Sequence, residues 1–75
     1  MEVSLGQLRL GQQGTVTAID APAALKKRLR AFGMVPGTDV RCRYRTPGGS
    51  VTAVELRSSV IALRTRDMRY IRVRC

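Results

Sequence analysis

The sequence has 75 residues, a formal net charge of +9 and an apolar fraction of 44%. A chain of this length makes one domain and buries only about 60% of the surface that its unfolded form exposes, so there is no room for a second core. No stretch approaches the roughly 20 apolar residues of a membrane span, and the N-terminal residues lack the apolar run of a signal peptide. We therefore expect a single cytoplasmic domain over residues 1–75.

Arginine dominates the positive charge. Twelve of the fourteen basic residues are Arg, whose planar guanidinium can bind a phosphate or a carboxylate with two parallel hydrogen bonds. Nucleic acid, an anionic membrane leaflet and an acidic protein surface fit this charge equally well. A solvated cationic surface with no specific partner fits it too, so the charge alone does not choose among these partners.

The residues that usually carry catalysis or bind metals are scarce. There is no histidine, and Cys42 and Cys75 do not form a CxxC pair, so the usual zinc sites cannot be assembled. The carboxylates are Glu2, Asp20, Asp39, Glu55 and Asp67. None is spaced as a catalytic pair or as a base beside a nucleophile, and the glycines lack the spacing of a phosphate-binding loop. We predict no enzymatic activity, no metal site and no cofactor, with Cys42 buried and Cys75 mobile.

The first part of the chain predicts one strand. Residues 4–10 carry Leu5, Leu8 and Leu10, which we expect to lie on the sheet ahead of the first regular strand. Residues 15–19 are rich in β-branched side chains and alternate, with Val16 and Ala18 on one face. This alternation predicts a strand at 15–19.

A single amphipathic helix follows. Leu25, Leu29 and Phe32 recur at the spacing that places them on one helical face, so we expect them in the core. Asp20 can cap the helix, or Ala21 can do so if Pro22 takes the first helical position, and the helix begins within two residues of Asp20. Gly33 is the expected helix stop, and the segment 35–38 has Pro and Gly at the central positions of a type II turn.

The rest of the chain predicts strands. Residues 38–45 alternate, with Val40, Cys42 and Tyr44 on one face and an arginine row on the other. Further strands are predicted at 51–57, 60–64 and 70–74, with a turn at Ser58-Ser59 and a helical turn at 65–69. Five short strands in so small a chain favour a closed or nearly closed barrel, with the helix between the first and second strands.

Surface recognition is the function that these residues leave open. The first candidate surface is the basic helix face and the helix exit: Lys26, Lys27, Arg30, Met34 and Val35. The apolar pair at the exit either packs back on the helix or forms an exposed contact. The second candidate is the arginine row Arg41, Arg43 and Arg45, whose ordinary interpretation is a solvated sheet face.

Arg28, near the helix C-terminus, suits a structural role in binding nearby carbonyl groups. Three aromatic residues are too few for a proline-binding groove.

The order of these features resembles the FeoA family, the small cytoplasmic accessory proteins of bacterial ferrous-iron transport. The matching residues are Leu5, Leu8, Gly11, Gly14, Val16, Arg28, Leu29, Gly33, Pro36, Gly37, Thr38, Val40, Ile61, Ala62, Leu63, Arg64, Ile71 and Val73. The resemblance implies an SH3-like barrel that acts as an adaptor on the ferrous-iron permease, a large membrane protein whose cytoplasmic part includes a GTPase domain. The charge of +9 is not expected from the family pattern alone.

Two functions of different classes follow. The first is a cytoplasmic adaptor that binds the ferrous-iron permease by protein–protein contact and reaches the inner membrane through it. The alternative is a basic SH3-like barrel that binds nucleic acid through arginine–phosphate contacts, although the shortage of aromatic residues argues against base stacking.

Overall fold

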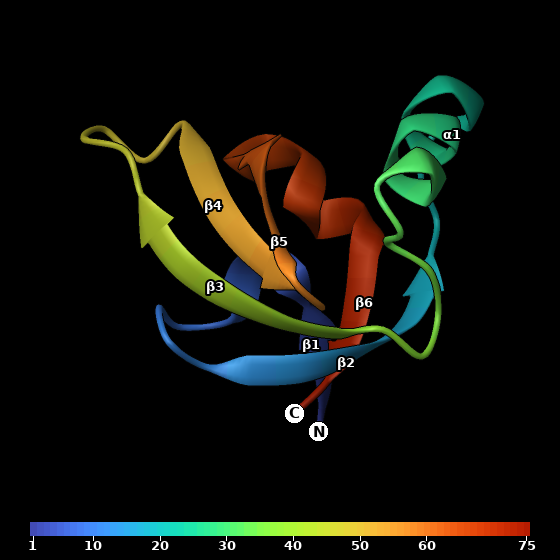
Figure 1. Cartoon of the computed structure of the whole chain (residues 1–75), viewed down its shortest axis with the longest axis horizontal. Helices are drawn as coiled ribbons and strands as arrows, with labels where there is room; N and C mark the ends of the chain where they lie inside the picture. The colour runs from blue at the N-terminus through green and yellow to red at the C-terminus, as the bar shows by residue number, and fades with distance from the viewer.

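The architecture is one curled antiparallel sheet with an α-helix beside it (Figure 1). The structure is a computed structural model and describes residues 1–75. The strands are β1 (Glu2–Ser4), β2 (Gln13–Ile19), β3 (Asp39–Arg45), β4 (Val51–Leu56), β5 (Ser59–Arg64) and β6 (Ile71–Arg74). The helices are α1 (Ala23–Ala31) and two short 3₁₀ helices, η1 (Leu5–Gln7) and η2 (Thr65–Tyr70). None of them has the length and apolar character of a membrane span.

The mainly β fold with one α-helix confirms the prediction, with two differences in detail. The sheet has six strands in the order β1-β6-β2-β3-β4-β5, because the three-residue strand β1 pairs with β6 at the other end of the chain. The helix therefore lies between β2 and β3. No pairing joins β1 to β5, so the sheet curls without closing into a barrel.

One apolar cluster fills the inside of the curl. It consists of Leu5, Leu8, Val16, Leu29, Met34, Val40, Cys42, Val54, Leu56, Leu63, Met68, Ile71 and Val73. Ile71 and Val73 of β6 point inward, and Leu5 and Leu8 cover the sheet as predicted. Leu10 does not, because it is 51% exposed in the turn that follows η1.

The end of α1 follows the predicted stop. Gly33 has a φ of 88°, and its N–H donates to the Arg30 carbonyl at 3.0 Å, while the Met34 N–H donates to the Leu29 carbonyl at 2.9 Å. These two bonds form a Schellman motif, which satisfies carbonyls that the helix end would otherwise leave free. In the turn that follows, Gly37 has a φ of 93° and the Thr38 N–H donates to the Val35 carbonyl at 3.1 Å, as a type II turn requires.

The start of α1 differs from the prediction. The helix begins at Ala23, Pro22 occupies the N-cap position, and no side chain caps the helix. Asp20 belongs to the preceding connection, where its N–H donates to the Tyr70 carbonyl at 2.9 Å. The expectation that Asp20 or Ala21 caps the helix is therefore wrong.

A bulge in β3 overturns the predicted facing of its last residues. The register with β4 pairs Cys42 with Val54 and Tyr44 with Ala53, which leaves Arg43 as the extra residue. Tyr44 is therefore 61% exposed instead of facing the core, and Arg45 is turned partly inward. The turn between β4 and β5 is Arg57-Ser58 rather than the predicted Ser58-Ser59, with Arg57 at a φ of 53°.

Candidate functional site

The helix side chains expected in the core are divided between core and surface. Leu29 is buried and Leu25 is partly buried, but Phe32 is 45% exposed. Phe32 stands at the C-cap of α1, where the chain reverses at Gly33 and brings Met34 into the core beside Leu29. Met34 is 0% exposed, so its assignment as an exposed contact residue is wrong. Phe32 takes the surface position instead.

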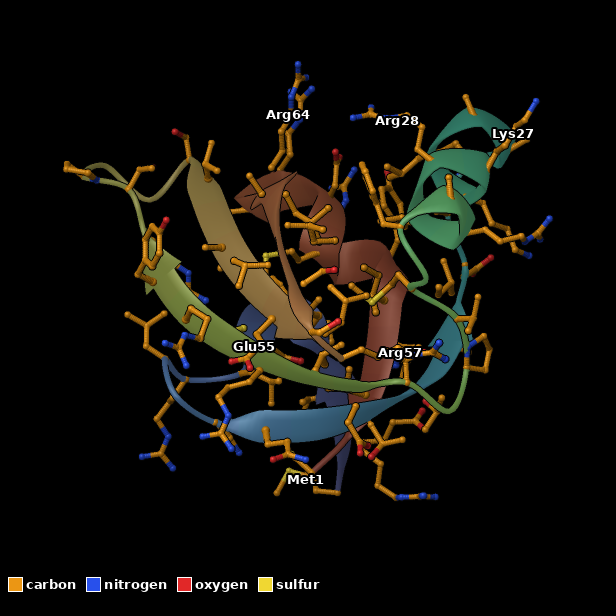
Figure 2. All side chains as sticks on the ribbon, in the orientation of Figure 1. Met1, Lys27, Arg28, Glu55, Arg57 and Arg64 are labelled. Carbon is orange, nitrogen blue, oxygen red and sulfur yellow. The ribbon has the colours of Figure 1, made fainter.

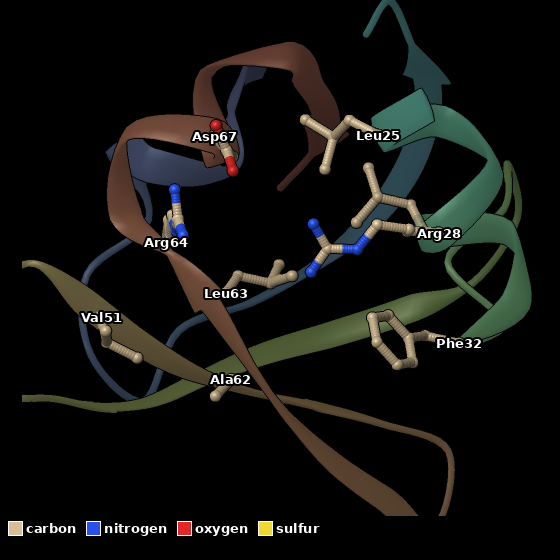
Figure 3. Close-up of a pocket in the computed structure, with 9 residues that line it drawn as sticks. Leu25, Arg28, Phe32, Val51, Ala62, Leu63, Arg64 and Asp67 are labelled. Carbon is tan, nitrogen blue, oxygen red and sulfur yellow. The ribbon is translucent and has the colours of Figure 1, made fainter. Parts of the chain in front are cut away.

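A groove lies between α1 and the β5 side of the sheet (Figure 3). Its lining consists of Leu25, Arg28, Leu29 and Phe32 from α1, Val51 from β4, Ala62, Leu63 and Arg64 from β5, and Asp67 from η2. Its volume is about 180 Å³, below the roughly 300 Å³ at which ligand pockets begin. The groove is therefore suited to a few side chains of another chain rather than to a cofactor.

Two arginines in this groove have no partner. In Figure 3, Arg28 extends from α1 toward Leu63, and Arg64 stands near Asp67. Neither guanidinium takes part in a hydrogen bond or ion pair, and the nearest basic partner of Asp67 is Arg66, with a distance of 3.9 Å from Arg66 Nε to Asp67 Oδ1. The groove thus combines an apolar floor with two free positive charges.

The other flank of α1 carries part of the predicted surface. Lys26, Arg30 and Val35 line a second groove of about 250 Å³, which lies between α1 and residues 17–19 of β2. Lys27 points away from the sheet into solvent (Figure 2). The structure therefore brings Lys26, Arg30 and Val35 together around this groove, with the buried Met34 also in its lining, and leaves Lys27 on the outer side of the helix.

The arginine row of β3 is engaged within the chain. Arg41 donates to the Gly11 carbonyl and to Gln13 Oε1, each at 3.0 Å. Arg43 forms an ion pair with Glu55 at 3.1 Å. Arg45 donates to Thr52 Oγ1 at 3.2 Å and approaches the carbonyls of Gly6 and Leu8 at 3.4 Å. These contacts join the N-terminal segment and β4 to β3, so the three side chains do not form a free cationic ladder.

Cys42 is a buried core residue, as predicted, and Cys75 is exposed. Burial raises the pKa of the Cys42 thiol, and the positive charge of nearby Arg45 opposes this shift with a smaller effect. A buried neutral thiol is a poor nucleophile and a poor metal ligand. No three His, Cys, Asp or Glu side chains come together in a way that could hold a metal ion.

Comparison with known families identifies the chain. Residues 3–75 match the family model of the FeoA domain. The chain belongs to the FeoA family. No curated protein matches it.

Solved FeoA structures share the fold. FeoA from Chlorobium tepidum gives a TM-score of 0.91 at 25% identity, over 96% of this chain and 69% of that one. FeoA from Stenotrophomonas maltophilia, solved with zinc and described as an SH3 domain protein, gives 0.83 at 29% identity, over 95% and 88%. A manganese-dependent transcriptional repressor gives 0.87 at 23% identity, over 97% of this chain and 41% of that one, which shows a shared fold alone.

The groove of this FeoA chain includes Arg28, Arg64 and Asp67, which the sequence predictions did not place on a contact surface. The predicted role of Arg28 in binding nearby carbonyl groups is wrong, because its exposed guanidinium has no hydrogen-bond partner. Arg28 lies three residues after Leu25 and four before Phe32, so helical spacing already places it on their flank. Helical spacing alone therefore places Arg28 in the groove. Arg64 and Asp67 lie beyond it in sequence, and only the packing of β5 and η2 against α1 brings them there.

Proposed function

We propose that this FeoA chain is a non-enzymatic adaptor of the ferrous-iron permease, which it contacts at the cytoplasmic part that contains the GTPase domain. Family membership supports the proposal. So does the Stenotrophomonas maltophilia relative, which is described as a candidate activating factor of bacterial ferrous iron transport. The adaptor acts in the cytoplasm and reaches the inner membrane through the permease.

The concentration of free positive charge on α1 carries the proposal. Three carboxylates are already paired with arginines, because Glu2 contacts Arg72, Glu55 contacts Arg43 and Asp67 contacts Arg66. The basic side chains of α1 are exposed and have no such partner: Lys26, Lys27, Arg28 and Arg30. A cationic helix with an exposed aromatic residue at its end is suited to an acidic protein surface, since arginine and aromatic side chains dominate the energetics of such contacts.

Co-purification tests the proposal. The purified chain is mixed at low salt with the intact permease in detergent and, separately, with the isolated cytoplasmic part. We expect both to retain the chain. We also expect the double variant Lys26→Glu with Arg30→Glu to bind at least about tenfold more weakly, because it reverses charge on an exposed face. If neither form of the permease retains the wild-type chain, the proposal is wrong.

The double variant also tests the assignment of the surface. Its fold is checked by circular dichroism and urea unfolding, since exposed substitutions of this kind usually change stability by less than about 0.5 kcal/mol. If the wild-type chain binds and the folded variant binds equally well, the adaptor function stands and this flank of α1 is not the contact. GTP hydrolysis by the permease, measured with and without the chain, then shows whether docking changes nucleotide turnover.

A salt titration separates the adaptor from a nucleic-acid-binding protein. Specific phosphate contacts give a steep linear fall of log affinity with log salt, and binding persists near physiological salt. Because Arg41, Arg43 and Arg45 are bonded within the chain, we expect DNA and RNA to bind only at very low salt. Binding to either near physiological salt would favour the alternative function.

A further inference from the structure

The strand β5 is an open edge of the sheet. It pairs with β4 on one side only, through a regular register that runs from Leu56 opposite Ser59 to Val51 opposite Arg64. In an antiparallel pair, residues alternate between those that bond across the ladder and those that do not. The tight turn places Ser59 in a bonded pair, and the Thr65 N–H donates to the Ser50 carbonyl at 2.9 Å. The backbone N–H and C=O groups of the odd-numbered residues of β5 therefore point toward β4.

The even-numbered residues of β5 point their backbone groups away from the sheet. The N–H and C=O groups of Val60 and Ala62 have no partner in the turns, loops or caps of the molecule. Edge strands are usually protected by Pro, Lys, a bulge or a covering segment. β5 has no Pro, Lys or bulge, and Val60 is 56% exposed. The edge is thus free to pair with another extended chain.

The groove of Figure 3 lies along this edge. Ala62, Leu63 and Arg64 form one wall, and Leu25, Arg28 and Phe32 reach toward them from α1. A strand added to β5 would enter the groove, bond to Val60 and Ala62, and place its side chains against apolar surface. This is the geometry of β-augmentation, in which backbone bonds provide affinity and the flanking pockets provide specificity.

The charge of the groove indicates what kind of segment can bind as the added strand. The groove offers the unpaired guanidinium groups of Arg28 and Arg64 against the single carboxylate of Asp67, which lies 3.9 Å from Arg66. A second copy of this chain would bring another net charge of +9 to the same place, which like-charge repulsion disfavours. A segment that alternates apolar and acidic residues fits both the floor and the charges.

We infer that β5 and the adjoining groove bind an extended segment of apolar and acidic residues in the permease's cytoplasmic part, as a seventh strand of the sheet. The identity of the partner rests on the proposed adaptor function. The backbone of the segment pairs with Val60 and Ala62, an apolar side chain packs on Leu25 and Phe32, and a carboxylate is bound by Arg28 or Arg64.

Two variants of the chain test the added strand. Ala62→Pro removes an N–H that points away from β4, so it blocks augmentation while it leaves the β4–β5 ladder in place. Arg28→Glu with Arg64→Glu reverses both charges at exposed positions. Affinity for the cytoplasmic part of the permease is measured by titration calorimetry. The fold of each variant is checked by its backbone-amide NMR spectrum. We expect each variant to bind at least tenfold more weakly than the wild-type chain.

Amide hydrogen exchange gives an independent readout on the wild-type complex. We expect the Val60 and Ala62 amides to become at least about tenfold more protected on binding, because they gain hydrogen-bond partners. Peptides of about 12 residues that tile the permease's cytoplasmic part locate the segment, and only acidic ones should reproduce this protection.

The outcomes separate the inference from the function on which it rests. If the wild-type chain binds and both folded variants bind equally well, or the two amides stay unprotected, the added strand is wrong and the adaptor function stands. If the wild-type chain does not bind at all, both are wrong. Protection of the two amides that depends on the concentration of the chain alone would mean that a second copy occupies the edge, and would overturn the acidic segment.

Discussion

Cys42 and Arg45, two residues of β3 on either side of its bulge, show how a local shift in register changes what a side chain does. The bulge at Arg43 keeps Cys42 in the core and turns Arg45 toward the N-terminal segment, where it approaches the carbonyls of Gly6 and Leu8. The alternation of residues 38–45 predicts Arg45 on the surface, but its side chain joins β3 to β4 and to the N-terminal segment. The same register buries the Cys42 thiol, which raises its pKa.

Burial predicts unequal reactivity for the two thiols. Cys75 is exposed and Cys42 is 0% exposed, so a disulfide reagent should modify Cys75 at once and Cys42 at least about 100-fold more slowly, through opening of the fold. The rates are measured on the Cys75→Ser and Cys42→Ala variants by release of the coloured thiol. Equal rates for the two thiols would show that Cys42 is not protected by the core.

The raised pKa of Cys42 also predicts a pH dependence of stability. The unfolded chain releases this proton near the ordinary thiol pKa of about 8.5, whereas the folded chain still holds it because the thiol is buried. The folded state then binds more protons, so its stability is complete below about pH 8 and falls as the pH rises toward the folded pKa. Urea unfolding from pH 7 to pH 10 should show this fall in the Cys75→Ser variant. The fall should be smaller when Cys42→Ala is added.

Met34 and Val35 should respond very differently to truncation. Met34→Ala removes a side chain that is 0% exposed and should cost about 2–5 kcal/mol, a large part of the roughly 4–11 kcal/mol expected for a domain of this length. Val35→Ala changes a partly exposed residue and should cost less than about 1 kcal/mol. The free energy of unfolding in urea measures both, and similar costs would contradict the placement of Met34.

At the scale of the element, the end of α1 depends on backbone conformation more than on contacts. Gly33 has a φ of 88°, and a Cβ built there would lie 3.9 Å from Leu56, in ordinary contact. Gly33→Ala should therefore destabilise the fold by about 1 kcal/mol through the left-handed conformation alone. Gly6→Ala is the matched control, since Gly6 has no positive φ and its Cβ would have only ordinary contacts. Urea unfolding should place the control within about 0.5 kcal/mol of wild type.

Elements defined by neighbouring residues could be predicted from the sequence, and those defined by distant pairing could not. Gly33 and the Pro36-Gly37 turn are local signals, and both occur where expected. The strand β1 is three residues long and exists only because β6 lies beside it. The bulge at Arg43 depends on the register with β4, so alternation within β3 could not show that Tyr44 faces outward.

The same distinction applies to the candidate site. Helical spacing places Arg28 on the flank of Leu25 and Phe32, so half of the groove could have been predicted from one helix. The other half comes from β5 and η2, which approach α1 only in the folded chain. Phe32 was assigned to the core because the helical period was extended to the C-cap, which Phe32 occupies one residue before the chain reverses at Gly33.

At the scale of the whole molecule, the basic side chains behind the net charge of +9 differ in whether they have partners within the chain. Ion pairs and hydrogen bonds engage much of it on the sheet, for example at Arg41, Arg43 and Arg72. Arg9, Arg57 and Arg74 are free at separate places on the sheet side, whereas five free basic residues lie close together on α1 and at the end of β5: Lys26, Lys27, Arg28, Arg30 and Arg64. Figure 2 shows Lys27, Arg28 and Arg64 projecting from the ribbon there. Charges on an exposed surface are screened over about 8 Å at physiological salt, so docking through them should weaken as salt rises.

A calorimetric titration of the wild-type chain with the isolated cytoplasmic part of the ferrous-iron permease tests the adaptor function most directly. We expect saturable binding at about 50 mM salt that weakens on going to about 0.5 M, because screening acts on the free cations of α1. We also expect no comparable binding to DNA or RNA at physiological salt. The absence of any heat of binding to the permease at low salt, with both proteins folded, would show that the chain is not an adaptor of the permease.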